Sequence, residues 1–340
     1  MIVEEPSQPA GRQEIRWGVL GCARIGDVVV PAIRACPGHR VLAAASRSQH
    51  RAAETAARWR IPRWYASYDR LLDDPEVDAV YLPLPNALHA GWTLKAIRAG
   101  KHVLCEKPLA LSASEVDEVA AAAELAGVIV TEAFAYRHHA LTERVIDLVQ
   151  EGAVGRPRLV RGSFTFLLAG EGDIRLDRSL GGGALWDVGC YPVSYARAVL
   201  HEDPAEASGR QTTGPTGVDV EFVGRLLFPS GAVLELDCGF WTPFRTWIEI
   251  VGSRGAITVE RPFLPGLRES IMLTLGGRVE TLRILGGDPY VAQVEAFGDA
   301  ITGRQPPRIT LADTRANTVA LAALHRSARE GRAVAVESDC

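Results

Sequence analysis

The sequence predicts an α/β fold, in which a doubly wound parallel sheet is followed by an α+β domain with a mainly antiparallel sheet. Two observations support this prediction. Short apolar runs alternate with helical segments between residues 15 and 131, as in a parallel sheet with helices on both faces. From residue 158 onward, strand-like runs follow one another across hairpin-type connections, Pro-Ser-Gly at 229–231 and Gly-Ser-Arg-Gly at 252–255.

The parallel part begins with a short apolar run at 15–20, which turn residues follow. Its helices carry boundary signals: Pro31 lies in a first turn, Gly100 closes a helix, and Ser112 with Glu115 forms a capping box. Strands are expected over residues 15–20, 40–46, 77–84, 102–105 and 128–131. Helices are expected over residues 28–36, 49–59, 68–72, 89–99 and 112–127. The handedness of crossover connections leaves few other topologies.

The second part is expected to be an antiparallel sheet with two late helices that pack back on the body of the protein. Its expected strands cover residues 159–166, 221–228, 232–238, 247–251 and 256–259, and its expected helices cover 290–302 and 312–330. The boundary is placed near Tyr136. The predicted organisation is therefore a flexible tail at 1–14, a first domain at 15–136 and a second at 137–340.

The composition argues against several classes of function. The 340 residues carry 37 Lys and Arg against 41 Asp and Glu, and no basic stripe, so nucleic acid is not an expected partner. No apolar stretch approaches the roughly 18 residues of a membrane span, and the acidic N-terminus lacks a signal-peptide apolar region. The six cysteines form no C-x-x-C spacing and no H-E-x-x-H occurs. This pattern favours a reducing, cytoplasmic setting and no metal site.

A glycine-containing turn follows the first strand. Its pattern is Gly21-x-Ala23-x-x-Gly26, with a strand before it and a helix after it. In this context backbone N–H groups and the helix N-terminus can meet a pyrophosphate. Alanine replaces the usual middle glycine, and its side chain is small enough to allow the approach. The pattern indicates a dinucleotide-binding turn, and the alternative is an ordinary connection between a strand and a helix.

The end of the second strand indicates which dinucleotide binds. An NAD-binding domain usually carries Asp or Glu there, whereas this chain has Ser46, Arg47 and Ser48. A hydroxyl and a guanidinium suit a 2′-phosphate, because arginine can bind phosphate through two hydrogen bonds. We therefore expect NADP rather than NAD, with Arg24 as a second charge. The alternative for Arg47 is a solvated loop residue.

Lys107 follows the fourth strand at its carboxyl end, where ligands bind in an open α/β sheet, and Pro108 fixes the backbone after it. A lysine there can donate to a substrate oxygen or stabilise a phenolate. Asn86, two residues after the expected strand at 77–84, is expected to cap a helix, and His89 is expected to pack on the cofactor. The alternative for Lys107 is a surface lysine.

Tyr191, in the glycine-rich segment 181–191, is the candidate for proton transfer. Acting as a base near neutral pH requires the pKa of a phenol to fall by about 2–3 units, or about 3–4 kcal/mol. An ammonium about 4 Å away supplies about 4 kcal/mol at an effective dielectric constant near 20. Lys107 is therefore expected to supply most of the drop. Asp187 opposes a phenolate, so we expect it to orient the substrate or Lys107; the alternative for Tyr191 is a core tyrosine.

Taken together, these motifs resemble those of the Gfo/Idh/MocA oxidoreductases, and the resemblance runs from about residue 15 to residue 336. The segments that carry it are Gly-Val-Leu-Gly-Cys-Ala-Arg-Ile-Gly at 18–26, Pro-Leu-Pro-Asn-Ala-Leu-His at 83–89, Glu-Lys-Pro at 106–108, Glu-Ala-Phe-Ala-Tyr-Arg at 132–137 and Gly-Gly-Gly-Ala-Leu-Trp-Asp-Val-Gly-Cys-Tyr-Pro at 181–192. A histidine stands at the position of Tyr191 in the inositol dehydrogenase branch. Tyrosine there, with Ser46 and Arg47, is similar to the branch of dihydrodiol dehydrogenase, NADP-dependent xylose dehydrogenase and glucose–fructose oxidoreductase.

The resemblance implies a Rossmann-type, dinucleotide-binding domain at 15–136. It also implies a substrate-binding and oligomerisation domain at 137–340 with a large open, mainly antiparallel sheet. This sheet would line the substrate cleft and make the contact of a homodimer or homotetramer. Lys107 would be the family's motif lysine, acting with Tyr191 and Asp187. The implied cofactor contacts are Gly21, Ala23, Arg24, Ile25, Gly26, Ser46, Arg47, Leu84, Pro85, Asn86, His89, Glu106, Lys107, Arg137 and Trp186.

The leading hypothesis is therefore an NADP-dependent dehydrogenase or reductase that acts on a sugar or a cyclic polyol. The first substrate to consider is an aldopyranose oxidised at C1 to a lactone. A nucleotide-linked 3-ketosugar reductase of deoxysugar biosynthesis is the second. Two hypotheses from other functional classes remain: an NAD-assisted glycosidase and a non-catalytic NADP(H) sensor. A sensor would keep its function when Lys107 or Tyr191 is replaced, whereas an enzyme would lose kcat.

Overall fold

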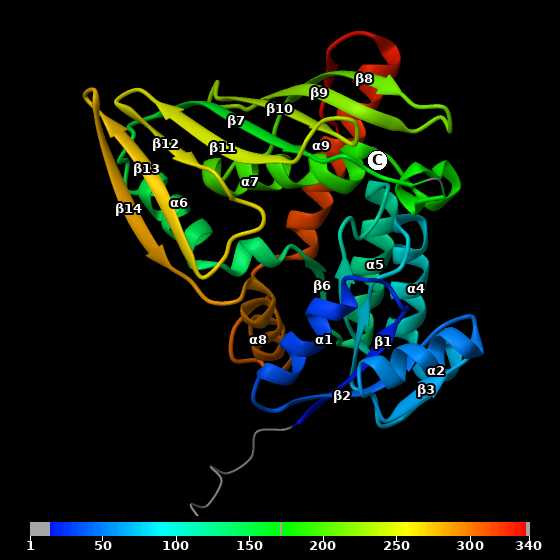
Figure 1. Ribbon diagram of the computed structural model, residues 1–340. Helices are drawn as coiled ribbons and strands as arrows, with labels where there is room; N and C mark the ends of the chain where they lie inside the picture. Colours follow the sequence, from blue (N-terminus) through cyan, green and yellow to red (C-terminus); the bar gives the residue numbers. More distant parts are fainter. Residues whose placement is uncertain (1–13, 171, 338–340) are drawn as a thin grey trace, which may run out of the picture.

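Two β-sheets organise the protein, and the computed structural model describes residues 14–170 and 172–337 (Figure 1). The first sheet is six-stranded and entirely parallel, in the order β3-β2-β1-β4-β5-β6. Its strands are β1 (Ile15–Leu20), β2 (His39–Ala45), β3 (Arg63–Tyr65), β4 (Ala79–Leu82), β5 (His102–Glu106) and β6 (Val130–Ala133). This is the strand order of a Rossmann fold, and the order reverses between β1 and β4.

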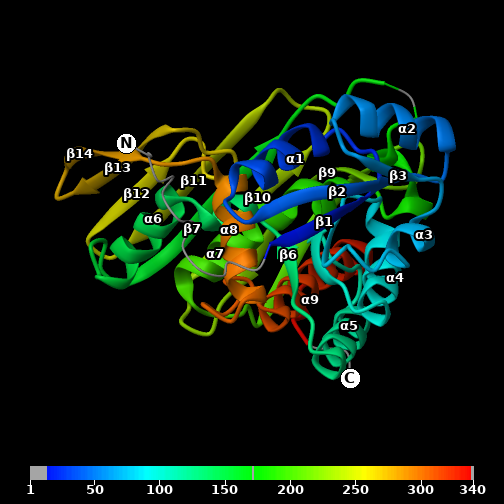
Figure 2. The same cartoon turned by 90° about the horizontal axis from the view of Figure 1, so that it is seen from below.

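Helices cover both faces of this sheet. They are α1 (Gly26–Ala35), α2 (Gln49–Arg58), α3 (Tyr68–Leu72), α4 (Asn86–Arg98) and α5 (Ala113–Ala126). One face is covered by α3, α4 and α5 and the other by α1 and α2. The half of that second face over β4, β5 and β6 receives no crossover helix. It is covered by α8 (Pro289–Ile301), which returns from the far end of the chain to lie beside α1 (Figure 2).

The second sheet has nine strands, and all pairs are antiparallel except β7 with β10. Its order is β14-β13-β12-β11-β7-β10-β9-β8-β15. The strands are β7 (Pro157–Thr165), β8 (Glu206–Thr213), β9 (Asp219–Leu227), β10 (Val233–Gly239), β11 (Arg245–Gly252), β12 (Gly255–Val259), β13 (Arg268–Leu275), β14 (Arg278–Leu285) and β15 (Val334–Ala335). The predicted fold class is therefore confirmed.

Helices cover only one face of the second sheet. These are α6 (Ala140–Gln150), α7 (Cys190–Leu200) and α9 (Leu311–Glu330), which bury a core shared with the inward side chains of the strands. The other face is open to solvent (Figure 1). Among the described residues, no helix combines the length and apolar character that crossing a membrane needs.

Several elements differ from the sequence prediction. Helix α4 begins at Asn86 rather than at His89, and its N-cap is Pro85, so Asn86 is not the cap that its residue type suggested. The strands β3, β8, β13, β14 and β15 and the helices α6 and α7 were not predicted. In β14 the cause is composition, because only Leu282 and Ile284 pack against the core and most other residues are exposed. The predicted tail lies outside the described residues except for Glu14.

Candidate active site

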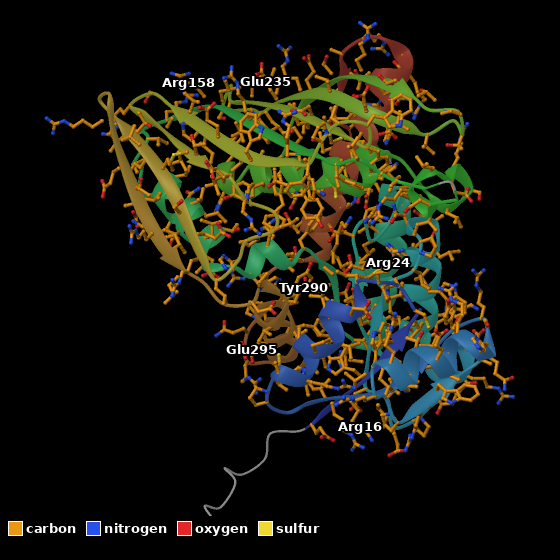
Figure 3. The ribbon with its side chains drawn as sticks, in the orientation of Figure 1. Arg16, Arg24, Arg158, Glu235, Tyr290 and Glu295 are labelled. Carbon is orange, nitrogen blue, oxygen red and sulfur yellow. The ribbon has the colours of Figure 1, made fainter. Side chains whose placement is uncertain are left out.

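The turn between β1 and α1 is shaped for the close approach of a ligand to the backbone. Gly21 has φ of 128°, and a Cβ there would press on Leu84. Gly26 packs so closely that a Cβ would collide with the indole of Trp59. The N-terminus of α1 has no side-chain cap, since its N-cap residue is Ile25. The partial positive charge of that terminus is therefore free to meet a phosphate. Arg24 is exposed on this turn, at the edge of the sheet that faces the second sheet, while Arg16 marks the opposite end of β1 (Figure 3).

The end of β4 lies beside this turn, at the point where the strand order reverses. Leu84 contacts the position of Gly21, and Pro85 opens α4. The side-chain amide of Asn86 donates a hydrogen bond to the carbonyl oxygen of Gly181 at 2.9 Å. Asn86 therefore joins the first sheet to the glycine-rich segment that precedes α7.

The loop after β2 presents arginine side chains at the same edge. Arg47 and Arg51 are exposed and lie close enough to the hydroxyl of Tyr68 to lower its pKa, although burial raises that pKa overall. Arg51 was not predicted. Ser46 is buried, and its hydroxyl accepts a hydrogen bond from the backbone N–H of Ser48 at 3.3 Å. The guanidinium groups, rather than the Ser46 hydroxyl, are therefore exposed to a ligand in this loop.

Lys107, immediately after β5, is the centre of an ion-pair chain in which Lys107 and Asp187 are largely buried and Arg175 is partly exposed. Its ammonium donates hydrogen bonds to Asp187, at 2.9 Å to Oδ1 and 2.7 Å to the main-chain carbonyl oxygen. The other carboxylate oxygen of Asp187 accepts a hydrogen bond from Nε of Arg175 at 2.7 Å. Burial acts to raise the pKa of Asp187, but the charges of Lys107 and Arg175 hold it below its ordinary value. Asp187 in turn holds the pKa of Lys107 well above its ordinary value, against the effect of burial.

A π-helical turn (Leu185–Gly189) that runs directly into α7 places Asp187 and Tyr191 on the side of Lys107. Such turns are often found at functional sites. Tyr191 lies four residues after Asp187, so both side chains occupy one side of the helix. The ammonium of Lys107 lies 5.2 Å from the centre of the Tyr191 ring. Residues from two distant parts of the sequence thus meet at the carboxyl edge of the first sheet.

Aromatic rings surround Tyr191. Its ring centre lies between 5.2 and 5.8 Å from those of Phe134, Tyr136, Phe164 and Phe263. Across residues 14–170 and 172–337, no protein group hydrogen-bonds its hydroxyl, which therefore remains available to a ligand.

The pKa of Tyr191 differs from the prediction. Burial raises it well above the ordinary value, and Lys107 lowers it by less than burial raises it. The physical reason is that burial disfavours the charged phenolate by more than the ammonium of Lys107 favours it, and the neighbouring Glu106 adds to the rise. Tyr191 is therefore a neutral phenol at neutral pH, suited to donating a proton.

Glu106 lies beside this cluster and accepts a hydrogen bond from the hydroxyl of Tyr81 at 2.7 Å. Burial raises the pKa of Glu106, and the neighbouring Lys107 opposes that rise. Glu106 thus places a second carboxyl group close to the ammonium of Lys107.

Three of the predicted cofactor contacts lie in other settings. His89 is buried, and its two ring nitrogens lie 2.7 Å from the carbonyl oxygen of Pro108 and 2.6 Å from that of Leu84. Arg137 hydrogen-bonds Ser194 and pairs with Asp313 at the start of α9. The indole of Trp186 lies 5.4 Å from the imidazole of His325. His89 braces two loops of the site, while Arg137 and Trp186 contact elements of the second half.

Sequence reasoning did not assign a role to Arg175, although it flanks the glycine-rich segment. In the sequence, Arg175 stands twelve residues before Asp187, and that spacing alone does not reveal a contact.

The described part of the chain contains no group of three or more His, Cys, Asp or Glu side chains that could hold a metal ion.

Two family models match the chain. Residues 15–134 match an oxidoreductase family with an NAD-binding Rossmann fold, and residues 142–258 match the GFO/IDH/MocA C-terminal domain. These two segments contain Lys107 and Tyr191, respectively.

Characterised proteins with similar sequences and structures agree with these matches. A D-xylose 1-dehydrogenase (NADP(+)) of Haloferax volcanii is 38% identical over 325 residues, which cover 94% of this chain and 99% of that protein. A 3-ketoreductase of Actinomadura kijaniata, solved in complex with NADP and TDP-benzene, superposes with a TM-score of 0.88 at 32% identity, covering 92% of this chain and 98% of that one.

An aldose-aldose oxidoreductase of Caulobacter crescentus, solved with glycerol, has a TM-score of 0.88 at 28% identity, covering 95% of this chain and 99% of that one. The resemblance that the sequence motifs indicated is thereby confirmed. From its two matched domains and its full-length relatives, the chain belongs to the Gfo/Idh/MocA family of oxidoreductases.

Proposed function

We propose that the protein is an NADP(H)-dependent oxidoreductase that transfers a hydride between the nicotinamide and a sugar carbon. The observation that carries this proposal is the Lys107–Asp187–Tyr191 cluster, which lies at the carboxyl edge of the first sheet with a free phenol hydroxyl. The relatives named above, a xylose dehydrogenase and a 3-ketoreductase, support NADP as the cofactor and a sugar as the substrate.

The residues around the β1–α1 turn fit a dinucleotide. The backbone at Gly21, Ala23, Ile25 and Gly26 and the uncapped N-terminus of α1 would hold the pyrophosphate. The exposed guanidinium groups after β2, with Arg24, would meet the 2′-phosphate. Leu84, Pro85, Asn86 and Glu106 would line the path to the nicotinamide. When bound, NADP(H) supplies the hydride chemistry.

The protein's own side chains manage the substrate oxygen. In the direction of reduction, Tyr191 donates its phenol proton to the carbonyl oxygen as the carbon receives the hydride, and the product is an alcohol. The ammonium of Lys107 stabilises the negative charge that then resides on the phenol oxygen. Asp187, held by Arg175, keeps Lys107 in place and charged. Oxidation uses the same groups in reverse, with a transient phenolate as the base.

Two substrate classes follow from this chemistry. The first is an aldopyranose, oxidised at C1 to a lactone. The second is a nucleotide-linked 3-ketosugar, whose reduction takes a proton from the neutral phenol of Tyr191. We infer that substrates of either class bind at one site. In this site Phe164 lies beside Tyr191, and Arg175 lies beside Asp187.

A substrate panel tests the proposal. Aldoses, inositols and nucleotide-linked ketosugars would be combined with NADP(H) and NAD(H), while the absorbance of the reduced nicotinamide is followed. We expect turnover with at least one sugar and a preference for NADP(H). Tyr191→Phe should lower kcat by at least about 100-fold, the range of a general acid. Absence of turnover with every sugar, with NADPH binding intact, would favour the sensor reading.

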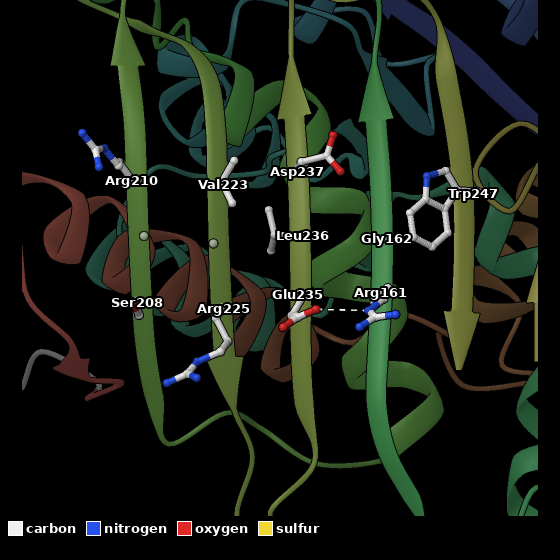
Figure 4. A pocket seen from close by; sticks show the side chains of 12 residues that line it. Arg161, Gly162, Ser208, Arg210, Val223, Arg225, Glu235, Leu236, Asp237 and Trp247 are labelled. Atoms are coloured by element: carbon white, nitrogen blue, oxygen red, sulfur yellow. Dashed lines mark hydrogen bonds and ion pairs between the residues drawn. The ribbon is translucent and has the colours of Figure 1, made fainter. Parts of the chain in front are cut away.

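We also propose that the open face of the second sheet joins two copies of the chain. This face carries paired charges, such as Arg161 with Glu235 and with Glu249, next to half-buried Trp247 and the exposed apolar residue Val223 (Figure 4). Mixed charge with scattered aromatic and apolar side chains is suited to a self-complementary interface. Residues 15–136 would then bind the dinucleotide and 137–340 the substrate and the partner copy. Light scattering of wild type against Val223→Glu would test this, with a smaller mass expected for the variant.

A further inference from the structure

Two buried carboxyl groups lie behind the Lys107–Asp187 pair, one from each sheet. Glu132, on β6, is 2% exposed, and Asp219, at the start of β9, is 3% exposed. Among the described residues, neither side chain hydrogen-bonds or pairs with the side chain of Lys107 or Asp187. Each instead binds the main chain two residues from one of them.

Glu132 holds the loop that follows Lys107. Its Oε1 accepts a hydrogen bond from the backbone N–H of Leu109 at 3.0 Å. Leu109 is fully buried, so this N–H has no access to water. A buried main-chain donor without an acceptor is costly, and Glu132 therefore fixes where this loop runs. The course of the loop sets where the Lys107 side chain begins.

Asp219 holds the turn that precedes Asp187. Its Oδ2 accepts a hydrogen bond from the backbone N–H of Leu185 at 2.7 Å, at the first turn of the π-helical segment. This contact acts as an N-cap supplied by a distant strand. Gly183 makes room for it, because a Cβ there would collide with the Asp219 carboxylate. The glycine-rich segment is thus shaped in part around Asp219.

We propose that Glu132 and Asp219 are a matched pair of positioning residues, which set the distance between Lys107 and Asp187 by clamping the main chain beside each. The inference deepens the proposed function and rests on it for its kinetic consequences. The two clamps come from different sheets, so together they fix how the two halves of the site meet. A displacement of about 1 Å at such a site can lower the rate about 100-fold.

The surroundings of each clamp determine how it titrates. Glu132 faces Arg197 of α7, Asp313 and Thr314 of α9, and the thiols of Cys105 and Cys190. Burial raises its pKa to about 7. Asp219 faces His325 of α9, whose Nε2 lies 4.0 Å from Oδ1, and the thiol of Cys238. Burial raises the pKa of Asp219 to about 6.

Paired substitutions separate the hydrogen-bond role from the charge. Glu132→Gln and Asp219→Asn keep an acceptor oxygen, so kcat should stay within about threefold of wild type. Glu132→Leu and Asp219→Leu remove the acceptor, and kcat should fall by about 100-fold. The KM for NADPH should not change in either pair, because the dinucleotide turn is untouched. A loss of kcat in the leucine variants, combined with its retention in the amide variants, is a result that a merely space-filling role would not give, because leucine also fills the site.

Thr131→Val is the matched control. Thr131 is the buried neighbour of Glu132 on β6, and its hydroxyl donates a hydrogen bond to the carbonyl oxygen of Ile309 at 3.0 Å. This variant should lose stability and keep kcat. The proposal is overturned if the leucine variants keep kcat, or if the control loses kcat as much as Glu132→Leu.

A measurement on the wild-type enzyme covers the case in which the leucine variants do not fold. The backbone amide resonances of Leu109 and Leu185 should be protected from hydrogen exchange and should shift as Glu132 and Asp219 titrate. Free exchange at either amide overturns the clamp. This readout needs no turnover, so it is independent of a failure of the proposed function itself.

Discussion

Replacing Lys107 with methionine gives a prediction whose magnitude can be calculated. The ammonium lies 5.2 Å from the centre of the Tyr191 ring, whose hydroxyl oxygen takes on negative charge when the phenol gives up its proton. At an effective dielectric constant near 20, two unit charges at that distance interact by about 3 kcal/mol. Because about 1.4 kcal/mol corresponds to a tenfold change in rate, we expect kcat of Lys107→Met to fall by about 200-fold.

The assay compares kcat with cofactor binding. Initial rates would be measured with the best sugar of the panel, and the Kd of NADPH would be measured by quenching of protein fluorescence. The Kd should change by less than about threefold, because the dinucleotide turn and the arginine loop are unaffected. The loss should therefore reside in kcat.

The chain provides a matched control in Lys101, a second buried lysine just before β5. Its ammonium donates hydrogen bonds to the carbonyl oxygens of Asp74 and Val77, both at 2.8 Å, at the opposite end of the strand. Lys101→Met should lower the melting temperature and leave kcat within about threefold. A kcat for Lys107→Met within threefold of wild type, or an equal loss in Lys101→Met, would refute the electrostatic argument.

Three further predictions concern the cofactor preference, the pH dependence of stability and the dinucleotide turn. Arg47→Asp should weaken NADPH binding by about 10- to 100-fold and leave NADH binding nearly unchanged, since a hydrogen bond to a charged group contributes about 1.5–3 kcal/mol; equal effects on both Kd values would contradict the 2′-phosphate assignment. The raised pKa of Glu132, about 7 against an ordinary 4.5, means that wild type loses stability as pH rises through that interval. The loss amounts to about 3 kcal/mol at most. Urea unfolding should therefore show a higher free energy of unfolding for Glu132→Gln than for wild type at about pH 8, and little difference at about pH 5. A difference that does not depend on pH would contradict the raised pKa of Glu132. Gly26→Ala should lower the free energy of unfolding by about 1–3 kcal/mol, because its Cβ displaces Trp59, whose indole N–H donates to Asp27; a melting temperature equal to that of wild type would count against this packing.

The sequence was informative wherever a local pattern carries a physical constraint. The Gly21-to-Gly26 turn, the capping box at Ser112 and the hairpin connections could be predicted because each depends on neighbouring residues only. The meeting of Lys107 with Asp187 was inferred by family resemblance and general chemistry. Its geometry depends on two sheets coming together, which no local pattern encodes.

The parts that sequence reasoning did not find depend on tertiary contacts. The role of Arg175 requires that it fold back on Asp187, and the two clamps require strands from different sheets. The pKa of Tyr191 was misjudged for the same reason. The prediction depended on the distance from an ammonium, whereas burial among aromatic rings that come from distant parts of the chain has the larger effect on the pKa.

The return of α8 to the first sheet has a consequence for protein engineering. Val294 and Phe297 of this helix pack against Trp17 and complete the apolar layer over β4 to β6. A fragment that stops at Tyr136 would leave that layer facing water. The nucleotide-binding half is therefore not an exchangeable module, and a chimera that borrows it from a relative must also carry over α8 to remain well folded.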